Sequence, residues 1–173
     1  MLLHPVALCS WCARPVAPKR TEGTMARILD VGGIIKKMHI PRICQHSACP
    51  GRQRRQWHNF RSHEGKHVFV GPASKLRCFM LTTKFGVTMP FLHQLHYRML
   101  REHVSFAGEA DVAHAMASMC NSEAELPQQS LRLYLSRVWF FWRLCIRLEE
   151  ISQRSSPCPE SMQSQVLCVS HKL

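Results

Sequence analysis

The chain has 173 residues, a formal net charge of +12 at pH 7 and a hydrophobic content of 46%. Its length suits one ordinary domain with a core and is too short for two full ones, and its hydrophobic content, which is average for a globular protein, does not require disorder. The positive charge favours anionic partners: nucleic acid, an anionic lipid surface or an acidic protein face.

The nine cysteines are an odd number and are spaced irregularly from Cys9 to Cys168. This pattern does not fit a disulfide framework, so the sequence favours a reducing intracellular compartment, either the nucleus or the cytoplasm. Residues 1–24 contain three prolines and no usable periodicity, and we expect a flexible leader there.

Cys9-Ser10-Trp11-Cys12 matches the CxxC pattern found in redox proteins. A redox role requires a βαβ pattern around the two cysteines, and this segment lacks one. A chance match is therefore our interpretation of Cys9 and Cys12.

Residues 25–126 are expected to form a small basic domain. Residues 26–40 carry two short apolar patches around Gly32-Gly33, which predict either a weak hairpin or a broken helix. Further along the chain, two cysteines and two histidines lie at metal-ligand spacing in residues 44–67.

In this segment, four residues separate Cys44 from Cys49, three separate His63 from His67, and thirteen lie between the two pairs. The spacing resembles that of the zinc-finger family with two Cys and two His, whose central loop is one residue shorter. The resemblance implies a zinc ion held by these four side chains, with both histidines on one face of a helix. Zinc is the only cofactor that the sequence suggests.

Two departures from that family leave an alternative open. Gln53 stands where such a finger has an aromatic residue, and Gly65 weakens the helix between the histidines. The alternative is a solvated basic loop. In either case the segment offers cations that could contact phosphate or another anion: Arg52, Arg54, Arg55 and Arg61.

Two β-like runs follow at residues 67–70 and 76–83, with a Gly-Pro turn between them, and they predict a hairpin over residues 67–83. Apolar residues at helical spacing predict helices over residues 91–104 and 109–120. The expected fold class is α+β or mainly α, as a small helical domain with one short β-hairpin and disordered N- and C-terminal tails.

Residues 127–154 predict an amphipathic helix with a wide apolar arc. A membrane span is disfavoured, because its central arginines cost roughly 7 to 10 kcal/mol on the insertion scale and its apolar residues return roughly 3 to 5. A membrane surface or a partner's groove could cover the helix instead. The residues expected to make that contact are Trp139, Phe141, Trp142, Arg143 and Arg147. Alternatively, this helix is the core of the small domain.

No motif presents a nucleophile or a phosphate loop, so we expect a non-enzymatic protein without a small-molecule substrate. The favoured function is binding of an anionic or groove-bearing partner through residues 127–154. Zinc-dependent binding of nucleic acid through residues 44–67 is one alternative, and a weakly selected chain with no defined activity is another. Residues 155–173 are polar and contain Ser and Pro, and we expect a disordered tail there.

Overall fold

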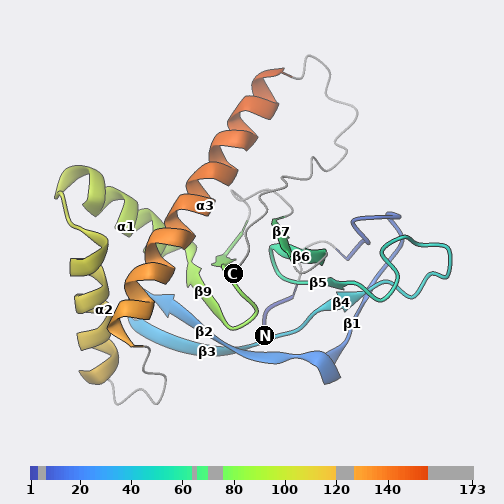
Figure 1. Ribbon diagram of the computed structural model, residues 1–173, viewed down its shortest axis with the longest axis horizontal. Coiled ribbons are helices and arrows are strands. Elements are labelled where there is room, and N and C mark those ends of the chain that lie inside the picture. Colours follow the sequence, from blue (N-terminus) through green and yellow to red (C-terminus); the bar gives the residue numbers. More distant parts are fainter. Residues whose placement is uncertain (4–6, 64–65, 70–75, 120–126, 156–173) are drawn as a thin grey trace. The chain divides into compact units, whose positions relative to one another are not determined.

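Figure 1 shows the computed structural model, which describes residues 1–3, 7–63, 66–69, 76–119 and 127–155. The chain divides into two compact units. The first comprises Met1–Thr24, Met38–Leu76 and Cys145–Leu173, and the second comprises Met25–Lys37 and Arg77–Leu144.

Five short strands form an antiparallel sheet in the first unit, in the spatial order β1-β4-β5-β6-β7. They are β1 (Ala17–Pro18), β4 (Arg42–Ile43), β5 (Arg55–Gln56), β6 (Phe60–His63) and β7 (Lys66–Phe69), and the 3-10 turn η1 (Arg20–Glu22) follows β1. Strands of two to four residues bury little apolar surface by themselves. The buried rings of Trp57, Phe60 and Phe69 supply the core, with ring centroids 6.3 and 6.2 Å from Phe60.

A second sheet has the order β3-β2-β9-β8 and runs mainly through the second unit. Its strands are β2 (Thr24–Asp30), β3 (Gly33–His39), β8 (Cys78–Met80) and β9 (Phe85–Thr88), and β2 pairs with β9 in parallel. Three helices complete the fold: α1 (Met89–Arg101), α2 (Phe106–Met119) and α3 (Gln128–Ser155).

The sequence explains how α1 begins and what it buries. The Thr88 hydroxyl accepts a hydrogen bond from the amide of Phe91, and Pro90 lies in the first turn, where a missing N–H costs nothing. The core of the second unit is built from apolar side chains at most 1% exposed, which include Ile28, Leu29, Phe79, Met80, Val87, Leu92, Leu95, Leu131, Leu135 and Val138.

The expected small helical domain with a single hairpin is wrong. The described residues form nine strands in two sheets beside three α-helices, so the fold is mixed α+β. Sequence periodicity did not reveal β1, β4 and β5, because a strand of two residues has no alternation to detect. In residues 26–40, the two patches are the adjacent strands β2 and β3, joined at Val31-Gly32, and Gly33 has a positive φ of 119°.

The hairpin expected over residues 67–83 does not form as predicted. β7 pairs with β6 in one sheet and β8 pairs with β9 in the other, so the two predicted runs are not partners. The expected turn falls in residues 70–75, which lie outside the described residues.

The three helices begin and end within three residues of their expected positions. Residues 1–24, where we expected a flexible leader, contain β1, η1 and an isolated bridge between Leu8 and Pro15. Almost all of the expected C-terminal tail falls in residues 156–173, outside the described part of the chain. No helix among the described residues has the length and apolar content needed to cross a membrane.

Candidate metal centre

Two cysteine loops meet at one end of the β1–β4 ladder. We define the first cysteine loop as residues 9–14 and the second as residues 44–54. β1 and β4 run antiparallel, with Ala17 opposite Ile43. The first loop precedes β1 and the second follows β4, so antiparallel pairing brings both to the same edge of the sheet.

Backbone hydrogen bonds give each loop its shape. In the first loop, the Cys9 amide donates to the Arg14 carbonyl over 2.7 Å, and the Ala13 amide donates to the Cys9 carbonyl over 2.9 Å. In the second loop, the Arg52 amide donates to the Cys49 carbonyl over 2.9 Å. The cysteines are therefore held by tight turns and not by long, loose connections.

The four cysteine sulfurs form one compact group. The Sγ atoms of Cys9, Cys12, Cys44 and Cys49 all lie within 4.8 Å of one another. Cys9 and Cys49 are 3.7 Å apart, and Cys12 and Cys44 are 3.6 Å apart. Four sulfurs about 2.3 Å from a tetrahedral metal ion would be about 3.8 Å apart. The four cysteines could hold a metal ion with little movement.

Each sulfur also accepts a hydrogen bond from the backbone amide two residues further along the chain. The donors are Trp11 to Cys9 at 3.4 Å, Gly51 to Cys49 at 3.3 Å, Arg14 to Cys12 and His46 to Cys44. An amide donor stabilises a thiolate more than a neutral thiol. This repeated arrangement suits four thiolate ligands.

Burial acts in the opposite direction on two of the sulfurs, those of Cys44 and Cys49. Cys9, Cys44 and Cys49 are buried, and burial raises the pKa of the Cys44 thiol and raises that of Cys49 to about 12. Cys12 is half-buried, and its hydrogen bond from the Arg14 amide lowers its pKa to about 7. Buried thiolates require a nearby cation, and a metal ion at the centre of the group would supply one.

Two strands of the first unit hold the first cysteine loop in place. The Ser10 amide donates to the Gln56 side-chain oxygen on β5 over 3.1 Å, and the Arg61 guanidinium on β6 donates to the Ser10 hydroxyl over 3.1 Å. The guanidinium also lies 4.4 Å from the Trp11 ring centre, and Trp11 packs directly on Gly51 of the second loop. These contacts fix the separation of the two loops independently of any ion.

The predicted ligands are divided between this centre and a hairpin. Cys44 and Cys49 belong to the sulfur group. His63 lies on β6 and His67 on β7, where His63 is opposite Lys66 and Ser62 is opposite His67. The helix expected to carry both histidines is therefore replaced by two paired strands, while their side chains lie outside the described part of the structure. Cys9 and Cys12 are the members that we did not predict as ligands.

The predicted anion-contact arginines all surround the metal centre or the sheet beside it. Arg52 is exposed in the second cysteine loop, and Arg54 and Arg61 lie near Trp11, with Arg54 5.9 Å from the ring centre. Arg55 on β5 pairs with Glu22 over 2.6 Å.

The predicted contact residues of α3 are distributed over two environments. Phe141 and Trp142 are buried, and the Trp142 ring packs edge-on against His93 of α1 with a centroid distance of 5.2 Å. Trp139 is half-buried and packs against Phe106. Arg143 and Arg147 are exposed, and Arg147 pairs with Glu150 over 3.0 Å.

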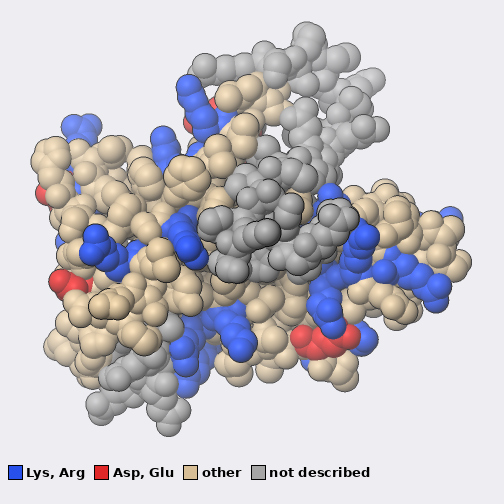
Figure 2. Space-filling model, in the orientation of Figure 1, with Lys and Arg blue, Asp and Glu red and all other residues tan. Residues whose placement is uncertain are grey.

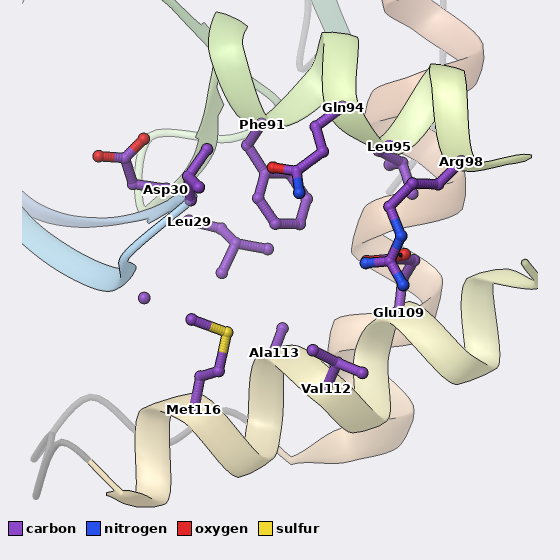
Figure 3. Close-up of a pocket in the computed structure, with 12 residues that line it drawn as sticks. Leu29, Asp30, Phe91, Gln94, Leu95, Arg98, Glu109, Val112, Ala113 and Met116 are labelled. Carbon is purple, nitrogen blue, oxygen red and sulfur yellow. Dashed lines mark ion pairs between the residues drawn. The ribbon is translucent and has the colours of Figure 1, made fainter.

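Figure 3 shows a small pocket in the second unit, with a cavity volume of about 50 Å³, between β2, α1 and α2. Apolar side chains line most of it, and Arg98 pairs with the buried Glu109 on one side over 2.7 Å. Burial raises the pKa of the Glu109 carboxyl, and Arg98 partly offsets this shift. The cavity has room for a few water molecules.

No protein-family model, curated protein or solved structure matches this chain.

Proposed function

We propose that this chain is a zinc-binding protein in which Cys9, Cys12, Cys44 and Cys49 hold one structural Zn²⁺ ion. The single observation that carries this proposal is the group of four sulfurs within 4.8 Å, with the two shortest separations close to the ligand spacing of a tetrahedral site. The amide donor on every sulfur supports the same conclusion.

A structural role follows from the number of ligands. Four protein sulfurs fill a tetrahedral zinc ion, whereas a catalytic zinc ion keeps one position for water or substrate. The ion would join two loops that come from distant parts of the sequence, so metal binding contributes directly to the folding of the first unit.

The donor set also favours zinc over other ions. A tetrahedral set of four thiolates suits Zn²⁺ or iron, and the general order of divalent-metal affinities places Zn²⁺ above Fe²⁺. Hard cations such as Ca²⁺ and Mg²⁺ prefer oxygen ligands, which this group lacks.

The test is metal analysis of the full chain purified under reducing conditions, followed by titration with Co²⁺, whose absorption reports thiolate coordination. We expect one metal ion per chain. Cys9→Ser and Cys44→Ser should each weaken binding about 100-fold or more, since each variant loses one quarter of a binding free energy of roughly 10 to 16 kcal/mol.

Two controls make this test specific. Cys78→Ser replaces a buried thiol in the second unit and should retain full metal affinity. A double His63→Ala/His67→Ala variant should also retain the metal. The proposal fails if the reduced protein takes up no stoichiometric metal, or if the histidine variant loses it.

Binding of an anionic lipid surface through α3 is a second candidate function. It is supported by the exposure of Phe140 (57%) and Ile151 (52%) on a helix that also exposes Arg143. Co-sedimentation with anionic vesicles tests it: Phe140→Ser should reduce binding, and equal recovery of wild type and variant in the pellet would exclude this use of α3.

A further inference from the structure

We infer that the basic surface around the metal centre binds the phosphate backbone of nucleic acid, an inference that rests on the zinc site proposed above. The surface belongs to the first unit alone. On the face drawn in Figure 2, Lys and Arg side chains gather over the region of β1, β4 and β5 in Figure 1.

The charge around the metal centre is strongly unbalanced. Among the described residues 1–3, 7–24 and 38–63, Glu22 is the only acidic residue. The same residues include eight cations: Arg14, Lys19, Arg20, Arg42, Arg52, Arg54, Arg55 and Arg61. Lys19 and Arg55 both pair with Glu22, over 2.5 and 2.6 Å, so this carboxylate is already shared by two of them. The remaining charge favours an anionic partner.

The cysteine loops themselves position two of these cations. The Arg14 amide donates to Cys12, and the Arg52 amide donates to the Cys49 carbonyl, while both side chains are exposed. A metal ion bound to the four sulfurs would hold both loops in place. It would therefore also fix the backbone positions of Arg14 and Arg52, from which the two side chains extend into solvent. The first unit thus presents cations at defined positions without using their side chains to bind the ion.

The chemistry of these cations fits phosphate. Seven of the eight are Arg, whose planar group binds phosphate oxygens through two parallel hydrogen bonds. A membrane surface would require an exposed aromatic or aliphatic face as well as charge. Trp11 beside the metal centre is half-buried and packs instead against Gly51 and the Arg61 guanidinium. A repeating phosphodiester needs only the cations, and contacts of this kind bind without reading sequence.

The experiment measures binding of the zinc-loaded full chain to a short fluorescent DNA duplex and to a single strand of the same sequence, over a series of salt concentrations. We expect the logarithm of the affinity to fall linearly with the logarithm of salt. A double Arg14→Ala/Arg52→Ala variant should lower the magnitude of this slope by about 2, since each phosphate contact contributes about 0.9. Its zinc content should be unchanged, because alanine retains both backbone amides.

The matched control is a double Arg77→Ala/Arg101→Ala variant, which removes the same charge from exposed positions of the second unit. Its salt slope should equal that of the wild type. Zinc-loaded protein that does not bind either DNA, two double variants with equal slopes, or tighter binding to anionic vesicles than to DNA would each overturn the inference. Failure of the zinc site is distinguishable, because it appears in the metal analysis of the same samples.

Discussion

The Trp11 ring rests on Gly51 so closely that a side chain at Gly51 has no room. A Cβ atom there would lie 2.2 Å from a ring carbon of Trp11. Gly51→Ala should therefore displace the ring and reduce stability by about 1 to 3 kcal/mol, the usual cost of overpacking. It should also weaken zinc binding, because making room for the added Cβ shifts the Gly51 backbone, whose amide donates to Cys49.

Chemical denaturation and competition with a zinc chelator measure these two effects. Gly32→Ala is the matched control, because a Cβ atom at Gly32 would meet no atom within 4 Å. Equal losses of stability and of zinc affinity in Gly51→Ala and Gly32→Ala would show that the contact with Trp11 does not support the metal centre.

His96 makes the stability of the second unit depend on pH. It lies between Trp139 and Trp142 on α3, with ring distances of 5.9 and 5.8 Å, and burial lowers its pKa from the ordinary value of 6.5, helped by Arg143 and His93. Below about pH 6.5 the unfolded chain takes up a proton that the folded chain resists, so the free energy of unfolding falls as the pH is lowered through this range.

Urea denaturation at a series of pH values from about 7.5 to 5 tests this effect. His96→Gln should weaken this dependence of the free energy of unfolding on pH. If the wild type and His96→Gln lose stability in parallel as the pH falls, His96 is not the source of the pH dependence.

The sequence revealed two of the four cysteines of the candidate metal site as ligands. Cys44 and Cys49 were recognisable by their spacing, and the CxxC pattern of Cys9 and Cys12 was visible but was weighed only as a redox motif. Cys44 lies 32 positions after Cys12, and only the pairing of β1 with β4 brings them together. A search confined to one segment selects the nearest histidines instead, because a spacing of four also fits a helix.

At the scale of elements, α3 divides its aromatic residues between core and surface. Trp142 is 2% exposed and packs against α1, whereas Phe140, two residues earlier, is 57% exposed. Trp142→Ala should therefore cost about 3 to 5 kcal/mol of stability. Phe140→Ala should change stability by no more than about 0.5 kcal/mol.

Guanidinium denaturation followed by circular dichroism compares the two variants of α3. A loss of stability in Phe140→Ala as large as that in Trp142→Ala would contradict the burial described for this helix.

The helices were predictable and most strands were not, for a physical reason. α1 and α3 repeat apolar residues over several turns, so their helical periodicity remains detectable even where single positions deviate from it. β4 and β5 have two residues each and include Arg42 and Arg55, so neither hydrophobicity nor alternation marks them. Their pairing depends on partners remote in sequence, which local patterns do not encode.

At the scale of the whole molecule, metal removal should affect the two units unequally. The first unit has strands of two to four residues and a small aromatic core beside the cysteine loops, whereas the second unit has a larger apolar core. Chelation under reducing conditions should therefore reduce amide hydrogen-exchange protection in residues 7–63 outside β2 and β3. Residues 85–101 and 128–144 should retain their protection.

Hydrogen exchange followed by mass spectrometry resolves the two units in the full chain. Cys78→Ser, with zinc bound, is the control for a general loss of stability. Uniform loss of protection along the chain after chelation would mean that the units do not respond independently to the metal.

The order of the cysteine loops along the chain has a consequence for biosynthesis. All four sulfurs precede residue 50, so a ribosome completes the ligand set before it reaches β9 (Phe85–Thr88), the strand that pairs with β2. If the four cysteines bind zinc as proposed, a nascent chain could take up the ion before most of the second unit has been translated. An ion bound at that stage would hold Cys9, Cys12, Cys44 and Cys49 together as thiolate ligands while the later cysteines are still to be synthesised.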